Sequence, residues 1–272
     1  MIPLQFVKKA GIGVTLGMAE KGGSVEKFFG SHAGGYAKSQ SHAHGPDLAA
    51  LIDGLLPTPT DLALDVATGT GFTAVALAPH VKRVTGIDVT NEMLEEAKKL
   101  VGSEKITNVG FRAGDALNME FSDSAFDIVT VRRATHHFKD VPRFLREAKR
   151  VLGTGGRLGV VDMSPLEGTE GFSNKIEILR DGSHVRAFTP AEWKSMVSEA
   201  GFKIRSAQVL REHISFQKWL YPVEPGGHEE ASIRLAWSGA SPEVRRLLKT
   251  DIDGDTVNGW TKTRIVLVAV KQ

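Results

Sequence analysis

Short apolar runs alternate with helical spacings through the first two thirds of the chain, after a glycine-rich start. The predicted strands are apolar runs bounded by polar residues or glycine, and they cover residues 62–66, 83–89, 109–113, 126–131 and 157–163. Helical spacing between and before them predicts helices over residues 47–56, 72–79, 91–101 and 141–152. Strands separated by helices predict a parallel sheet with helices on both faces.

Beyond Pro165 the pattern is less regular, and no clear helix is predicted before Thr189. A capping box at Thr189–Glu192, with proline at the first helical position, predicts a helix over 190–200 that ends at Gly201. The remaining predicted elements are strands at 202–209 and 263–270 and a short helix at 242–249. The prediction is therefore an α/β fold with seven strands.

Composition excludes several classes of chemistry. There is no cysteine among the 272 residues, which excludes disulfides, thiolate metal sites and a cysteine nucleophile. Basic residues number 34 against 32 acidic ones, without a basic run, so we expect a small-molecule partner and no nucleic acid. No metal site is expected, because the calcium-loop-like start at Asp251 has Thr256 and Lys262 where glycine and glutamate are required.

The chain carries no signal for a membrane span. No apolar stretch reaches the length that a bilayer requires. The segment Ala10–Ala19, which follows two lysines, contains three glycines and has no small-residue cleavage pattern behind it. We therefore expect a cytoplasmic protein, and the sequence leaves its oligomeric state open.

A glycine loop, Asp65–Gly71, joins the first predicted strand to its helix. Glycine lets the backbone approach a ligand closely, and ligands of open parallel sheets bind beyond the carboxyl ends of the strands. The segment Gly69–Ala74 also satisfies the G-x-G-x-x-A form of a dinucleotide loop. However, Asp65 would repel a pyrophosphate and attract a sulfonium or an ammonium group.

Two further acids follow the next predicted strands. Asp88 ends the second strand, where a carboxylate can accept both hydroxyls of a ribose, and Asp115 follows the third, where it can accept an exocyclic amine. Acids at three successive strand ends outline a nucleoside.

These motifs resemble those of class I S-adenosylmethionine-dependent methyltransferases, over roughly residues 36–209. The matching segments are Leu64–Gly71, Gly86–Asp88, Gly114–Ala116, Phe126–Asp127, Arg150–Leu152 and Gly155–Gly156. Ala67-Thr68 and the run Thr135–Phe138 are most similar to the ubiquinone and menaquinone biosynthesis C-methyltransferases, although that pattern often has glycine where this chain has Ala67. The resemblance implies a doubly wound, Rossmann-like sheet of seven strands, the last antiparallel beside the sixth, with a small cap.

The resemblance also implies roles for single residues. Asp65, Gly69 and Gly71 would face the methionine part of S-adenosylmethionine, Asp88 its ribose, and Asp115 its adenine. Tyr36 would close over the cofactor or simply pack. The full set of expected cofactor contacts is Tyr36, Asp65, Ala67, Thr68, Gly69, Gly71, Asp88, Val89, Asp115, Ala116 and Arg132.

Candidates for the chemistry follow the fourth and fifth strands. A sulfonium already activates its methyl group, so a base is useful only for a phenol, an enol or an acidic carbon. His136 and His137 are the candidate bases, and we expect one of them to be a core residue. Arg180, His184 and Arg186 suggest binding of an anionic or carbonyl-rich acceptor. Alternatively, these charges pair with Glu177, Asp181 or Glu192.

The predicted organisation has three parts: a lid or loosely ordered segment at 1–45, a cofactor-binding half at 46–165, and a substrate cap with the last strands at 166–272. The leading hypothesis is a methyltransferase with a small organic acceptor. An NAD-type oxidoreductase and a non-catalytic nucleoside-binding module are the alternatives. The acceptor and the methylated atom stay open.

Overall fold

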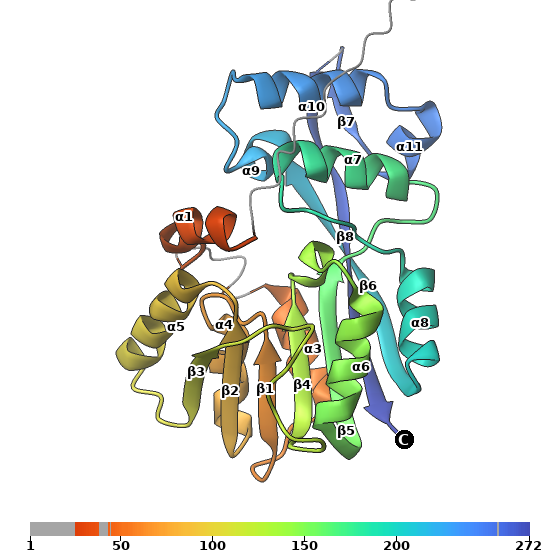
Figure 1. Ribbon diagram of the computed structural model, residues 1–272. Coiled ribbons are helices and arrows are strands. Elements are labelled where there is room, and N and C mark those ends of the chain that lie inside the picture. The colour runs from red at the N-terminus through yellow and green to blue at the C-terminus, as the bar shows by residue number, and fades with distance from the viewer. Residues whose placement is uncertain (1–24, 38–42, 44, 255) are drawn as a thin grey trace, which may run out of the picture.

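The computed structural model describes residues 25–37, 43, 45–254 and 256–272 (Figure 1). Its centre is one sheet with the strand order β3-β2-β1-β4-β5-β8-β6, and β7 pairs with β8 off this path. The strands are β1 Leu62–Val66, β2 Arg83–Asp88, β3 Val109–Ala113, β4 Phe126–Arg132, β5 Leu152–Met163, β6 Phe202–Ser215, β7 Asp251–Asp253 and β8 Thr256–Lys271.

Strands β3, β2, β1, β4 and β5 pair in parallel, and helices cover both faces of the sheet (Figure 1). Apolar residues of α6 (Val141–Val151) and α8 (Pro190–Glu199) share one buried cluster with β1, β4 and β5. Those of α3 (Pro46–Leu55) and α4 (Phe72–Leu77) share a second cluster with the opposite side chains of the same strands. The predicted doubly wound architecture is confirmed. The other helices of this half are η1 Ala78–His80, α5 Asn91–Ser103 and η2 Thr135–His137.

Strand β8 runs antiparallel between β5 and β6, which confirms the predicted placement of the last strand. Both β6 and β8 are longer than their predicted ranges of 202–209 and 263–270. Their pairing continues to Ser215 opposite Gly259, well beyond the end of β5 at Met163. This extended hairpin rises from the sheet and supports a separate layer of helices (Figure 1).

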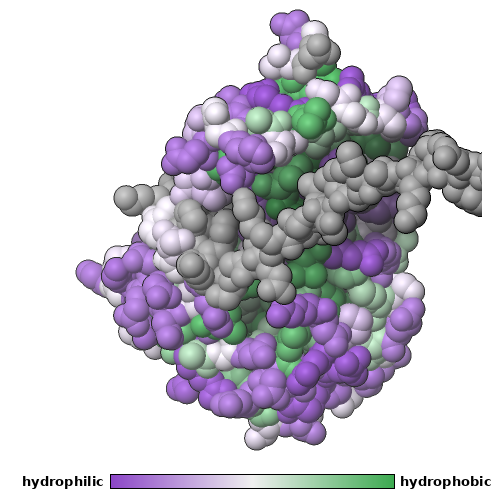
Figure 2. Space-filling view, turned by 45° about the horizontal axis from the view of Figure 1, so that its top comes forward, coloured by the Kyte–Doolittle hydropathy of each residue, from purple (hydrophilic) through white to green (hydrophobic). Residues whose placement is uncertain are grey.

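The separate layer is a cap above the carboxyl edge of the sheet (Figure 1). Its helices are α7 Glu170–Arg180, α9 Phe216–Leu220, α10 His228–Ser238 and α11 Pro242–Leu247. They enclose an aromatic core in which the Trp260 ring lies 4.9 Å from Trp219 and 4.8 Å from Trp237. Figure 2 shows hydrophobic surface gathered between the cap and the sheet on the face it presents.

The expectation that no clear helix lies between Pro165 and Thr189 is wrong, because α7 lies within that stretch. Helix α10 was also not predicted. In α7, Phe172, Ile176 and Leu179 have helical spacing and pack into the cap core. This helical spacing covers only three apolar residues, so the sequence pattern was too short to predict the helix. The other helices of the cap provide the apolar surface against which these residues pack.

Residues 25–37 form helix α1 within the segment predicted as a lid or loosely ordered. In the part of the chain that the structure describes, no helix is long and apolar enough to cross a membrane.

Close packing of α3 on β5 provides a test of the fold. A Cβ added to Gly159 would lie 2.6 Å from Leu51 Cδ1 and 3.2 Å from Leu55 Cδ2. Both leucines are fully buried. We therefore expect Gly159→Ala to lower the free energy of unfolding in urea by about 1–3 kcal/mol. Gly110→Ala on β3 is the control, since its added Cβ meets nothing within 4 Å. Equal stability of the two variants would contradict this packing.

Candidate functional site

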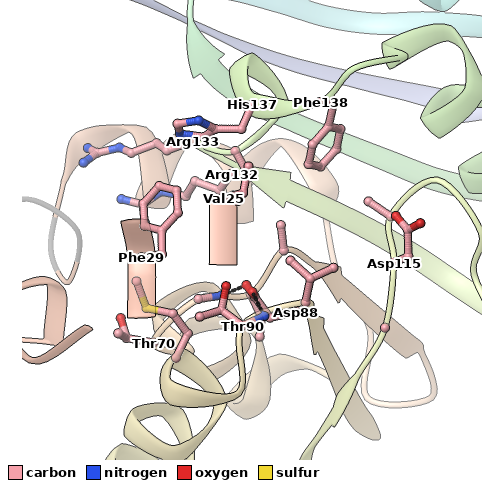
Figure 3. A pocket seen from close by; sticks show the side chains of 18 of the residues that line it. Val25, Phe29, Thr70, Asp88, Thr90, Asp115, Arg132, Arg133, His137 and Phe138 are labelled. Carbon is pink, nitrogen blue, oxygen red and sulfur yellow. Dashed lines mark hydrogen bonds between the residues drawn. The ribbon is translucent and has the colours of Figure 1, made fainter. Parts of the chain in front are cut away.

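A cavity of about 240 Å³ lies where the parallel strands end (Figure 3). Its wall comes from the loops after β1 to β4 and from α1. The lining residues are Val25, Phe29, Ala67, Thr68, Gly69, Thr70, Phe72, Thr73, Asp88, Val89, Thr90, Met93, Gly114, Asp115, Ala116, Leu117, Arg132, Arg133, Ala134, His137, Phe138 and Lys139. The cavity therefore brings together eight of the eleven expected cofactor contacts.

The glycine loop takes a left-handed path, with φ of 51° at Ala67, 54° at Gly69 and 86° at Gly71. A Cβ added to Gly69 meets nothing within 4 Å, and Gly69 lines the cavity. A Cβ on Gly71 would instead lie 3.0 Å from Ala97 and Phe111, so this glycine serves packing rather than the cavity. The positive φ at Ala67 explains why glycine suits that position in the family pattern.

Asp65 lies beneath the loop rather than in the cavity wall, contrary to the expectation that it faces the methionine part. It is 1% exposed. Its Oδ2 accepts the Thr68 hydroxyl at 2.6 Å and its Oδ1 accepts the Thr130 hydroxyl at 2.8 Å. Burial raises the pKa of Asp65 to about 6, although both hydroxyls act in the opposite direction. Asp65 therefore holds Thr68, which itself lines the cavity.

Asp88 faces the cavity from the end of β2 (Figure 3). Its Oδ2 accepts the Gly69 N–H at 2.8 Å and its Oδ1 accepts the Thr90 N–H at 2.9 Å. Burial raises the pKa of Asp88, while these backbone donors act to lower it. Two fixed donors orient the carboxylate, and each oxygen retains a lone pair that can accept a ribose hydroxyl.

Asp115 lies on another side of the cavity, after β3 (Figure 3). Its Oδ1 accepts the Leu117 N–H at 2.8 Å. Ala116, Leu117 and Phe138 add apolar surface beside it. Apolar side chains together with a carboxylate suit adenine and its exocyclic amine. Together with Asp88 and the open space at Gly69, the residues present fit S-adenosylmethionine.

Two arginines at the end of β4 share one buried carboxylate, that of Asp47 in the first turn of α3. Arg133 Nε lies 2.9 Å and Arg132 Nε 3.2 Å from Asp47 Oδ2. Burial alone would raise the pKa of Asp47, but the two guanidinium groups lower it to about 2. Burial and the nearby Arg264 and Arg132 lower the pKa of Arg133 to about 10, so it stays protonated at neutral pH. Arg132 and Arg133 therefore bring two guanidinium groups to this wall of the cavity. Sequence reasoning did not identify Asp47.

The two candidate histidines in η2 differ in their surroundings. His136 is buried, and its Nδ1 lies 2.6 Å from Asp162 Oδ1. His137 lines the cavity, and its ring meets Phe29 of α1 edge-on at 5.0 Å (Figure 3). His137 Nδ1 lies 3.1 Å from both the carbonyl oxygen and the hydroxyl of Ser183. Of the pair, only His137 can meet a ligand in the cavity.

The three residues expected to bind the acceptor, Arg180, His184 and Arg186, are not among the residues that line this cavity. Arg180 pairs with Glu177 at 2.8 Å, and Arg186 pairs with Glu192 near the surface. His184 is buried, with its Nε2 2.8 Å from Asn174 Oδ1. Both arginines therefore form ion pairs with glutamates, which was the alternative to acceptor binding.

Tyr36 lies in α1, but its side chain falls outside the described part of the structure. Its expected contact with the cofactor therefore stays a prediction.

A parallel sheet with a glycine loop and two carboxylates around one cavity defines a nucleoside-binding protein of the Rossmann-like class. Residues 64–160 match a family model described as a methyltransferase domain. The uncharacterised methyltransferase YcgJ of Bacillus subtilis is 34% identical over 219 residues, which are 80% of this chain and 87% of that protein. The YcgJ crystal structure matches with a TM-score of 0.80 over 84% of this chain and 99% of that one.

A demethylmenaquinone methyltransferase of Thermotoga maritima is 38% identical over 129 residues, 46% of this chain and 53% of that protein. The chain belongs to the class I S-adenosylmethionine-dependent methyltransferases and is related to the ubiquinone and menaquinone group. The predicted family, enzyme class and cofactor are confirmed. The oxidoreductase alternative is set aside.

The raised pKa of Asp65 predicts a pH-dependent stability. The native state binds this proton below about pH 6, whereas the unfolded chain releases it above about pH 4. Stability should therefore fall as pH rises from about 4 to 6, by about 3 kcal/mol from this carboxyl. Asp65→Asn, which has no proton to lose, should remove that part of the slope in urea unfolding curves. Parallel curves for parent and variant would refute the assignment.

The geometry at Asp88 predicts its contribution to cofactor affinity. Asp88→Ala removes the expected acceptor of two ribose hydroxyls and should weaken binding of S-adenosylhomocysteine by about 2–4 kcal/mol. Calorimetry measures this affinity, with the exposed Asp123→Ala as the matched control. Urea unfolding curves of the parent and Asp88→Ala show whether the substitution has also lowered the stability of the protein. Unchanged affinity would mean that Asp88 does not hold the ribose.

Proposed function

We propose that this protein methylates a small organic acceptor that carries an acidic proton, such as a phenol, an enol or a carbon beside a carbonyl group. His137 is proposed as the general base. The observation that carries this proposal is the position of His137 in the wall of the cofactor cavity.

The protonation state of His137 supports this role. Burial lowers its pKa well below the usual 6.5, and the neighbouring His136, 4.0 Å away between ring centroids, acts in the same direction. The imidazole is therefore neutral at neutral pH and has one nitrogen lone pair that can accept a proton. Because the His137 ring is already neutral, it does not have to lose a proton before it can act as a base.

The rest of the wall suits an acceptor that becomes negative as it loses its proton. Arg132 and Arg133 place two guanidinium groups at one side of the cavity. Val25, Phe29 and Phe138 provide apolar surface that excludes water, which would compete for both the proton and the methyl group. A related protein is named as a demethylmenaquinone methyltransferase.

In the proposed reaction, His137 accepts the acidic proton while the acceptor's freed electron pair forms a bond to the methyl carbon. Bound S-adenosylmethionine supplies that carbon on a sulfonium, whose sulfur keeps the electrons of the broken S–C bond. The arginines stabilise the developing negative charge on the acceptor. His137 and Phe29 hold the acceptor against the cofactor, so that orientation provides much of the rate.

The test uses methyl-labelled S-adenosylmethionine with a panel of phenols, enols and β-dicarbonyl compounds. For an acceptor that is methylated, His137→Gln should lower kcat by about 10²- to 10⁴-fold. Affinity for S-adenosylhomocysteine should stay within about twofold, since no cofactor contact is assigned to His137. The exposed His80→Gln is the control and should behave like the parent.

The pH profile adds a second criterion. Because the pKa of His137 lies well below 6.5, its protonation should not slow the parent enzyme between about pH 8 and pH 6.5. Full activity of His137→Gln on every accepted compound would show that no base at this position is used.

A further inference from the structure

The proton on His137 can be located from its partners. Its Nδ1 lies 3.1 Å from the Ser183 carbonyl oxygen, which can only accept a hydrogen bond. Its second partner, the Ser183 hydroxyl, lies at the same distance and could either donate or accept. The direction of that second hydrogen bond depends on which acceptor receives the single O–H of Ser183.

The Ser183 hydroxyl donates its proton to Asp181 Oδ1 at 2.6 Å. A hydroxyl-to-carboxylate bond of this length is a strong, charge-assisted one. The Ser183 oxygen therefore offers only lone pairs to His137. Both partners of Nδ1 are then acceptors, so Nδ1 carries the proton, and in the neutral ring Nε2 carries the lone pair.

We propose that Asp181 is a positioning residue for His137: it accepts the hydrogen bond from the Ser183 hydroxyl and thereby keeps His137 in the tautomer with an unprotonated Nε2. Ser183 holds the Nδ1 side of the ring, and the ring lines the cavity, which leaves Nε2 toward the acceptor. The use of Nε2 as a base rests on the proposed function, but the choice of tautomer does not.

The turn that carries these groups is tied to η2 at a second point. Asp181 Oδ1 also accepts the Ser183 N–H at 2.8 Å, and the His184 N–H bonds to the Asp181 carbonyl at 3.0 Å. The N–H groups of Val185 and Arg186 bond to the His136 carbonyl at 2.8 and 3.0 Å. Because Asp181 directly follows α7, the cap acts on the base through this turn.

Among the described residues, the neighbouring charged groups are engaged elsewhere and do not compete for Nδ1. Asp162, the other nearby carboxylate, accepts from His136 Nδ1 at 2.6 Å and from the His136 N–H at 3.0 Å. His184 is bound to Asn174. Asp181 is 3% exposed and Ser183 is 6% exposed, so water has little access to compete for the hydrogen bond between them.

The decisive measurement is the ¹⁵N NMR spectrum of the histidine rings in the full chain with S-adenosylhomocysteine bound. His137→Gln assigns the His137 signals by their loss. The parent should show a protonated Nδ1 and an unprotonated Nε2 for His137. A parent spectrum with the proton on Nε2 overturns the proposal without any further variant.

Variants separate the positioning role from a merely structural one. Asp181→Ala frees the Ser183 hydroxyl to donate to Nδ1, so signal for the Nε2-protonated tautomer should grow. The double variant Asp181→Ala, Ser183→Ala leaves only the carbonyl acceptor, so it should restore the proton to Nδ1. Asp181→Asn keeps an acceptor oxygen and should resemble the parent. An Asp181→Ala spectrum identical to that of the parent overturns the proposal.

Kinetics connect the tautomer to the reaction. With an accepted compound, Asp181→Ala should lower kcat by about tenfold or more, and the double variant should recover part of that loss. Affinity for S-adenosylhomocysteine should stay within about twofold in all of them. The spectra need no acceptor, so they decide the role of Asp181 even where His137→Gln shows that the proposed base is wrong.

Discussion

The parallel pairing of β3, β2, β1, β4 and β5 is the constraint on which the site depends. Because neighbouring strands run the same way, their carboxyl ends meet at one edge, and the loops that follow them form one cavity. The register of β1 with β2 brings the glycine loop next to Asp88, whose carboxylate accepts the Gly69 N–H. Residues distant in the sequence thus line one cavity.

Three buried carboxylates order the backbone around that cavity without lining it themselves. Asp65 holds the glycine loop through Thr68, Asp47 holds the two arginines after β4, and Asp162 accepts the Thr135 hydroxyl and the His136 ring. Burial of each charge is unfavourable, and hydrogen bonds or cations at short distance offset it. Where cations or a histidine are bonded to the carboxylate, its pKa falls to about 2. The carboxylate of Asp65 is bonded to two hydroxyl groups, and burial raises its pKa to about 6.

The cap connects to the site through backbone and hydroxyl groups rather than through its charged side chains. Arg180 and Arg186 are held in ion pairs with glutamates. The turn after α7 instead places Ser183 on His137. The cap and the wall of the cavity are therefore in direct contact at His137.

Local signals in the sequence were sufficient for the seven main strands and the glycine loop, but not for β7 or for the full length of β6 and β8. Strand-to-helix spacing, the Asp65–Gly71 loop and the acids after β2 and β3 lie within short segments, so pattern and residue chemistry predict them. The contacts that choose between candidates are long-range: Ser183 lies 46 residues from His137, and Asp47 lies 86 from Arg133. No local pattern encodes such pairs. Only folding, which buries them together, decided that His137 lines the cavity and that the cap arginines do not.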